Sequence, residues 1–157
     1  MPDPSGGMTA GAPGPVLFAY DGSELAKLAI SVAGRELGQG REAIVLTVWQ
    51  PFNVGFIPPG EMNVDAADGE EVSRAAEATA AEGAALAQAA GFHASTASLR
   101  GAPAWQGIVD AADQHGASVI ALGSRGRSGV ASVLIGSVAE AVAAHSKRSV
   151  LIVHDGG

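Results

Sequence analysis

The sequence predicts an α/β fold, an open five-stranded parallel sheet with helices on both faces. Short apolar runs alternate along the chain with longer segments of helical periodicity, which is typical of parallel sheets. The apolar runs are continuous, and this indicates strands that are buried on both faces. A length of 157 residues suits one domain.

The first half of the chain is expected to supply two strands and two helices. VLFAY (16–20) is a short apolar run and predicts a buried strand. Segment 23–38 carries leucine and alanine at helical spacing and stops at glycines, as helices often do. AIVLTVW (43–49) repeats the buried-strand pattern. A long irregular stretch at 51–69, with three prolines and three glycines, is typical of a lid or binding loop. The alanine- and glutamate-rich segment 70–91 predicts a helix.

The second half is expected to supply three strands and two helices. FHASTASLR (92–100) has moderate strand propensity. Segment 101–116 predicts a helix with a proline near its first turn, where a missing N–H costs little. ASVIALG (117–123) is a strongly apolar strand. After a glycine-rich loop, a helix is expected at 137–147 and a last strand at 149–154.

The composition excludes several classes of function. The net charge of −7 argues against nucleic-acid binding, which needs a basic face, and favours a soluble cytoplasmic protein. The absence of cysteine excludes disulfides and thiol nucleophiles, and the four histidines lack the spacing of a metal cluster. No apolar run approaches the roughly 20 residues of a membrane helix. The Gly- and Pro-rich residues 1–14 lack signal-peptide features and predict a flexible lead-in to a domain at 15–157.

The loop GSRGRSGVASVLIGS (123–137) is the strongest functional signal in the chain. Glycines let backbone N–H groups approach an anion, and the loop leads into the N-terminus of a helix, which favours negative charge. The spacing matches neither the Walker loop nor the dinucleotide fingerprint. The alternative is that the glycines serve turn geometry only and that Ser137 caps its helix. In parallel folds ligands bind beyond the carboxyl ends of strands, here after Tyr20, Val48 and Leu122.

The full spacing G-x2-G-x9-G-S, formed by Gly123, Gly126, Gly136 and Ser137, resembles the ATP-binding signature of the universal stress protein family. AYDGSE (19–24) is similar to the family's first strand end, and the resemblance covers about residues 15–155. It implies a Rossmann-like fold of the adenine nucleotide alpha hydrolase-like type. It also implies an ATP ligand, with Mg²⁺ held by the phosphates, and a homodimer formed through the last strand. Ser118 departs from the family, where an acidic residue is common before the fourth strand.

The resemblance also implies a set of nucleotide contacts. Asp21 would contact the nucleoside, although Asp21 and Glu24 also have the spacing of a capping box. The main chain at Val48 would hold the adenine edge. Arg125 would either clamp a phosphate or be solvated, and Arg127 is expected to be a solvated loop charge. The full set of expected contacts is Ala19, Tyr20, Asp21, Val48, Leu122, Gly123, Arg125, Gly126, Gly136, Ser137 and Val138.

Three functions remain open from the sequence. The first is an ATP-binding, nucleotide-sensing regulatory module in the stress response, which acts on an unknown protein partner. The second is a slow ATP-hydrolysing enzyme, although the loop offers no evident residue to position water, and no catalytic or metal-binding residue is assigned. The third is a nucleotide-free stress interaction protein. This hypothesis is the weakest of the three, because the chain keeps the glycines of the signature.

Overall fold

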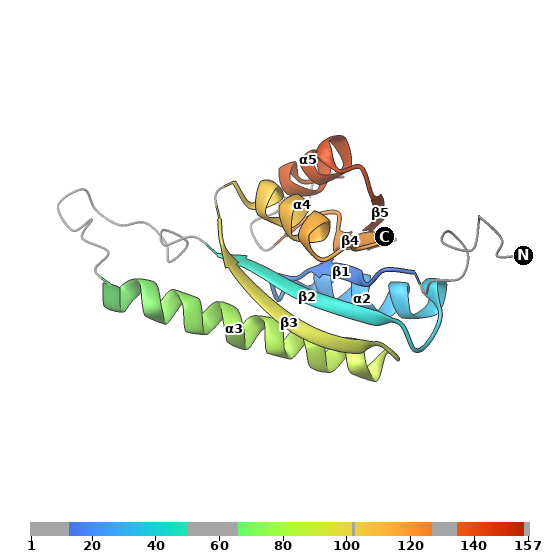
Figure 1. The fold of residues 1–157 in the computed structure, drawn as a ribbon, viewed down its shortest axis with the longest axis horizontal. Coiled ribbons are helices and arrows are strands. Elements are labelled where there is room, and N and C mark those ends of the chain that lie inside the picture. The colour runs from blue at the N-terminus through green and yellow to red at the C-terminus, as the bar shows by residue number, and fades with distance from the viewer. Residues whose placement is uncertain (1–12, 50–65, 102, 127–134, 156–157) are drawn as a thin grey trace, which may run out of the picture.

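The computed structural model describes residues 13–49, 66–101, 103–126 and 135–155 (Figure 1). Within these ranges the chain alternates strand and helix. The strands are β1 (Val16–Ala19), β2 (Glu42–Trp49), β3 (His93–Arg100), β4 (Val119–Gly123) and β5 (Ser149–Val153). The helices are α2 (Glu24–Leu37), α3 (Ala66–Ala89), α4 (Ala104–Gln114) and α5 (Ser137–His145).

The five strands form one parallel sheet in the order β3-β2-β1-β4-β5. The chain first builds outward from β1 to the edge at β3, and then returns to the other side of β1 to add β4 and β5. The direction of winding therefore reverses between β1 and β4, which is where folds of this kind bind ligands. The predicted fold class is confirmed, and the last strand, β5, lies at an edge of the sheet.

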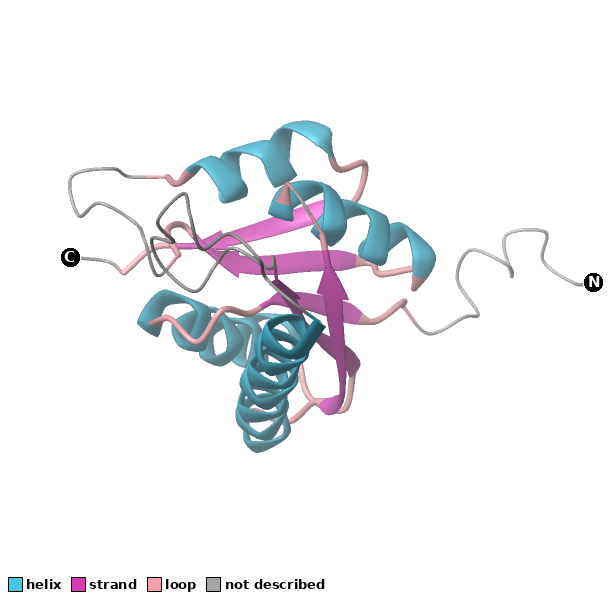
Figure 2. Cartoon of the chain, turned by 90° about the vertical axis from the view of Figure 1, so that its left-hand side faces the viewer, coloured by secondary structure: helices cyan, strands magenta, loops and turns pink. Residues whose placement is uncertain are grey.

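Two helices cover each face of the sheet (Figure 2). α2 and α3 pack on one face, and α4 and α5 lie together on the other. Successive side chains of β1 alternate between the two faces, with Phe18 on the α2/α3 side and Leu17 on the α4/α5 side. In the described part of the chain, none of the helices combines the length and the apolar character that crossing a bilayer requires.

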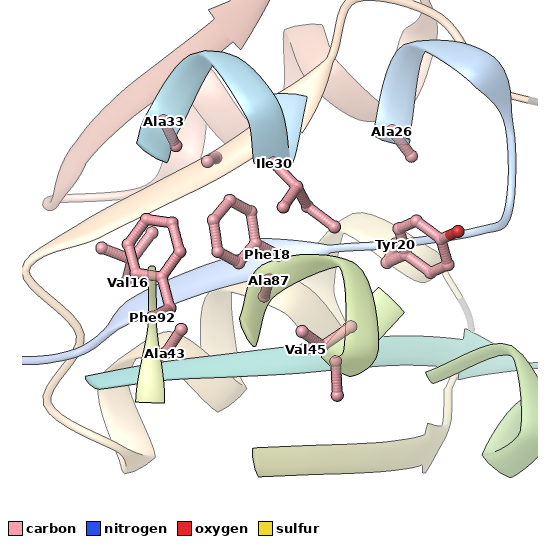
Figure 3. Close-up of a cluster of buried hydrophobic side chains, with 12 residues drawn as sticks. Val16, Phe18, Tyr20, Ala26, Ile30, Ala33, Ala43, Val45, Ala87 and Phe92 are labelled. Atoms are coloured by element: carbon pink, nitrogen blue, oxygen red, sulfur yellow. The ribbon is translucent and has the colours of Figure 1, made fainter. Parts of the chain in front are cut away.

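The α2/α3 face is closely packed because its helices present small residues (Figure 3). Phe18 and Phe92 meet edge to face, with ring centroids 5.2 Å apart. A Cβ at Gly83 of α3 would lie 2.7 Å from Val45 Cγ1 and 2.8 Å from Tyr20 Cδ2. The sheet and α3 can approach this closely only without that side chain, so the alanine-rich helix forms a close-packed layer on the sheet.

Two predicted boundaries differ from the structure. α3 begins at Ala66 rather than at residue 70, because Gly69 does not interrupt a turn that the neighbouring alanines favour. The remainder of the predicted loop, 51–65, lies outside the described residues. Helix α2 begins at Glu24 with Ser23 as its N-cap, and Ser23 Oγ accepts a hydrogen bond of 3.2 Å from the backbone N–H of Ala26. The predicted capping box headed by Asp21 is therefore wrong.

The folded part of the chain begins earlier than the predicted lead-in of 1–14 allows. The carbonyl of Gly14 accepts hydrogen bonds from Arg41 Nη2 at 3.1 Å and from Ser118 Oγ at 2.8 Å. A side chain at Gly14 would overlap the carbonyl oxygen of Gly116. Ser118 Oγ also lies 2.6 Å from Arg41 Nη2, so the serine at this position joins the first and fourth strands to the start of the second. Residues 1–12 lie outside the described part.

Candidate functional site

The carboxyl ends of β1, β2 and β4 lie side by side in the middle of the sheet. Their last side chains on one face are Ala19, Val48 and Leu122, and all three belong to the apolar cluster under α4 and α5. Leu122 is buried, whereas Ala19 and Val48 are half-buried. The structure therefore brings these predicted site residues together at one edge, on the face where α5 begins.

The side chain of Tyr20 lies on the opposite face, among the α2/α3 cluster (Figure 3). It is only 2% exposed, and its hydroxyl donates a hydrogen bond of 2.5 Å to Glu82 of α3. Burial raises the pKa of this phenol, and the Glu82 carboxylate raises the pKa further. The carbonyl of Tyr20 accepts a hydrogen bond of 2.9 Å from the buried hydroxyl of Thr47. Tyr20 therefore anchors the end of β1, and its contact with a base stays a prediction.

Asp21 lies in the turn between β1 and α2, where Gly22 has a φ of 82° that favours glycine. Its Oδ1 accepts a hydrogen bond of 2.9 Å from the backbone N–H of Ser23. Its Oδ2 faces Gly126 of the loop after β4, since a Cβ at Gly126 would lie 2.7 Å from that oxygen. The fold thus joins Asp21 to the glycine loop, although more than a hundred residues separate them in sequence.

Gly123, the first glycine of the signature, has a structural reason for lacking a side chain. A Cβ there would lie 2.7 Å from Leu25 Cβ and 2.9 Å from the Leu25 carbonyl carbon. The end of β4 therefore packs directly on the first turn of α2. This contact positions the loop that follows at the switch between β1 and β4.

Gly136, the third glycine of the signature, is the N-cap of α5 and supplies no side chain to cap the helix. Its N–H donates to the Ser124 carbonyl at 2.5 Å, and a Cβ there would lie 3.3 Å from that oxygen. The first helical bond is donated by Glu140 to the Gly136 carbonyl, so the N–H groups of Ser137 and Val138 have no partner within the helix. Both residues are exposed. Ser137 is the first helical residue and not the cap, so the alternative that it caps α5 is wrong.

Arg125 forms an ion pair with Asp155, which follows β5, at 2.6 Å between Nη2 and Oδ2. The side chain of Arg125 is 18% exposed. Arg125 and Asp155 line a groove with the first turns of α2. Arg127 and the rest of the loop from 127 to 134 lie outside the described residues, so the expectation for Arg127 stays untested.

Three residues that sequence reasoning missed help to build this edge. Thr47 fixes the end of β1 through the hydrogen bond from its hydroxyl to the Tyr20 carbonyl. Ser124 is 1% exposed. Its N–H donates a hydrogen bond of 2.8 Å to the Val153 carbonyl, and its carbonyl accepts a hydrogen bond from the N–H of Gly136. Asp155 holds Arg125. Ser124 lies inside the glycine signature, where its buried place could have been suspected, but nothing in the sequence links Asp155 to a residue thirty positions away.

No metal site emerges from the part of the chain that the structure describes, because its histidines and carboxylates do not gather in groups of three or more. His145 stacks on Trp105 with ring centroids 4.2 Å apart, which joins α4 to α5. Arg100 lies over the Trp49 ring at 5.9 Å. Both tryptophans are therefore engaged in packing between neighbouring elements.

Solved structures share this fold over almost the whole chain. The hypothetical protein MJ0577 is 24% identical, over 92% of this chain and 97% of that one, with a TM-score of 0.73. A universal stress protein in complex with cAMP is 29% identical, over 92% and 98% of the two chains, with a TM-score of 0.57. A universal stress protein from Archaeoglobus fulgidus in complex with dAMP is 24% identical, over 88% and 95%, with a TM-score of 0.58. No curated protein matches the sequence.

The family comparison gives a match over nearly all of the folded part. The model of the universal stress protein family matches residues 14–154. This range begins at Gly14, whose carbonyl accepts hydrogen bonds from the side chains of Arg41 and Ser118. It ends just after β5. The chain belongs to the universal stress protein family.

Proposed function

We propose that this protein binds ATP at the carboxyl edge of β1, β2 and β4 and acts as a nucleotide-sensing regulatory module in the stress response. The observation that carries the proposal is the start of α5. Gly136 leaves this helix without a side-chain cap, and the N–H groups of Ser137 and Val138 have no partner within the helix. Such a helix start favours a phosphate through its N–H groups and its dipole.

The neighbouring residues fit the rest of a nucleotide. The Asp21 carboxylate lies beside Gly126 and is suited to accept hydrogen bonds from ribose hydroxyls. Val48 and Ala19 are half-buried apolar residues at the strand ends, suited to one face of the adenine ring. The main chain of residues 123–126 runs between these groups and α5. Mg²⁺ would arrive on the phosphates and neutralise part of their charge.

The comparison with the cAMP complex supports an adenine nucleotide as the ligand class. That relative is 29% identical to this chain and aligns over 98% of its own length. Its ligand contains adenine, ribose and phosphate, which are the three groups that the edge described above can accommodate. ATP is our choice within this class because Gly123, Gly126, Gly136 and Ser137 have the spacing of the ATP-binding signature that the chain resembles.

A calorimetric titration of ATP into the purified protein tests the proposal. We expect saturable binding with one site per chain. Ser137→Asp should weaken ATP binding about tenfold or more, because a carboxylate at this exposed helix start competes with phosphate for the same N–H groups. It should leave the helix intact, since acidic residues stabilise helix N-termini.

Ser31→Asp is the matched control for that variant. Ser31 is an exposed residue of α2, and its substitution makes the same change in net charge without approaching the carboxyl edge. We expect ATP to bind Ser31→Asp as tightly as wild type. If wild type does not bind ATP at millimolar nucleotide, the proposed function is wrong. If both variants weaken ATP binding equally, the start of α5 is not the phosphate site.

We further propose a homodimer formed through β5 and a cytoplasmic location. β5 is an edge strand of apolar residues, of which Val150, Leu151 and Ile152 are half-buried within the single chain. An apolar edge strand needs a cover, and a second copy of β5 would provide one across a two-fold axis. The cytoplasmic location rests on the acidic composition and the absence of cysteine.

A further inference from the structure

The main chain and the side chain of Arg125 lie at two different places. A Cβ at Gly136 would lie 3.6 Å from Arg125 Cα, so the main chain of Arg125 is packed against the start of α5. Its guanidinium instead reaches Asp155, at 2.6 Å. The guanidinium of Arg125, whose main chain borders the proposed phosphate site, is therefore held by an acidic residue of the chain itself.

The surroundings of the Arg125 side chain would not hold a cation without Asp155. The groove that receives it is lined by the N-cap Ser23 and by Glu24, the first residue of α2. A helix N-terminus carries partial positive charge, which disfavours a guanidinium. The Asp155 carboxylate offsets this repulsion through a charge-assisted hydrogen bond. Glu24 adds little, because its side chain is 92% exposed and faces Lys27 at 3.5 Å.

We propose that Asp155 is a positioning residue that competes with the nucleotide phosphates for Arg125. This inference rests on the proposed function, since it concerns the affinity of the same site. In the nucleotide-free protein Asp155 holds the guanidinium over the start of α2. A bound triphosphate offers Arg125 a second anion, beside the start of α5, and binding includes the exchange of one anionic partner for the other.

The proposal predicts that Asp155 affects charged ligands and spares uncharged ones. Asp155→Asn keeps the shape of the side chain and removes the competing charge, so Arg125 should turn to the phosphates. We expect ATP to bind this variant about threefold to tenfold more tightly than wild type, the effect of removing a partly buried ion pair. Adenosine, which has no phosphate, should bind both proteins equally. Calorimetric titrations with ATP and adenosine measure both effects.

A second ion pair of the chain provides the matched control. Arg148 Nε lies 2.9 Å from Asp113 Oδ1, with side-chain exposures of 29% and 59%, close to the 18% and 56% of Arg125 and Asp155. Asp113 is in α4, and it pairs with Arg148 just before β5, at the opposite end of the strands. Asp113→Asn makes the same change in net charge, and we expect it to leave ATP affinity unchanged.

Arg125→Gln identifies the group through which Asp155 acts. In the Arg125→Gln background, Asp155→Asn should no longer tighten ATP binding, because the guanidinium is absent. The inference is overturned if Asp155→Asn binds ATP no more tightly than Asp113→Asn, or if its effect persists without Arg125. If wild type and all variants fail to bind ATP, the proposed function falls together with the inference. If wild type binds ATP and only the variant pattern fails, the inference falls alone.

Discussion

A methyl group at Gly123 would overlap the first turn of α2, whereas one at Gly136 would lie 3.3 Å from the Ser124 carbonyl oxygen. Gly123→Ala should therefore destabilise the protein by about 1–3 kcal/mol, because the helix must move to relieve the overlap. Gly136→Ala should cost less than about 1 kcal/mol, since alanine is only a poorer N-cap there. Urea unfolding of both variants measures the difference. A larger cost at Gly136 would contradict this account of the loop.

Gly69→Ala provides the control for that comparison. Gly69 lies within α3, and a Cβ there would meet nothing within 4 Å. The same substitution should therefore stabilise the protein by about 0.5–1 kcal/mol, because alanine favours helix and loses less backbone entropy. If Gly123→Ala lowers the free energy of unfolding and Gly69→Ala raises it, the cost at Gly123 comes from steric overlap and not from alanine itself.

Tyr20 makes the stability depend on pH in the alkaline range. Burial and then Glu82 raise its pKa above the ordinary value of about 10, so the folded state favours the neutral phenol. Its contribution to stability is complete below about pH 10, and it is lost as the pH rises towards the raised pKa. Tyr20→Phe should cost about 1 kcal/mol at pH 7, through the hydrogen bond to Glu82, and less at higher pH.

Two measurements check this prediction. Urea unfolding from pH 7 to 11 should show the two proteins converging in stability. Tyr20 is the only tyrosine of the chain, so phenolate absorbance reports its titration directly in the folded protein. Titration at the value of an exposed tyrosine would contradict the buried position of Tyr20.

At the scale of the element, α2 depends on its cap. Ser23 Oγ accepts a hydrogen bond from the N–H of Ala26, whereas the sequence suggested Asp21 as the head of a capping box. Ser23→Ala should destabilise the protein by about 0.5–2 kcal/mol. Ser31→Ala, within the same helix and exposed, should be neutral or slightly stabilising. Thermal unfolding compares the two variants. An equal effect of both substitutions would contradict a stabilising role of Ser23 as the N-cap of α2.

Most elements were predictable because four of the five strands are continuous apolar runs, while β3 was predicted from moderate strand propensity and α3 from its alanine- and glutamate-rich composition. Their ends were less predictable, because caps depend on which side chain turns back to the backbone. Asp21 and Ser23 are both good N-cap residues, and only the geometry shows that Asp21 accepts from Ser23 while Ser23 caps the helix. The start of α3 was placed too late, because glycine is typical of loops and the sequence alone does not show that Gly69 continues the helix.

At the scale of the whole molecule, the proposed dimer depends on the open edge at β5. We expect a dimer at micromolar concentration, with a mass by light scattering of about twice that of one chain, because apolar edge strands pair. Val150→Lys should shift the protein to monomer by placing a charge on this edge. Leu86→Lys, at an exposed leucine of α3, is the control and should remain dimeric. A monomeric wild type would contradict the proposed dimer.

The site could be located from the sequence only in outline. Parallel strands bring their carboxyl ends to one edge, so the approach of Asp21 to Gly126 follows from the order of elements and the glycine signature. The burial of Tyr20 on the far face required the register of β1, because a side chain one position further along a strand points the other way. The pairing of Arg125 with Asp155 required the three-dimensional fold, since no local pattern joins the two.

The most direct measurement of the central claim is a crystal structure of the protein soaked with ATP. The account predicts density for the triphosphate against the N–H groups of Ser137 and Val138, with the ribose beside Asp21. Density elsewhere on the protein, or an unoccupied carboxyl edge at saturating ATP, would contradict it.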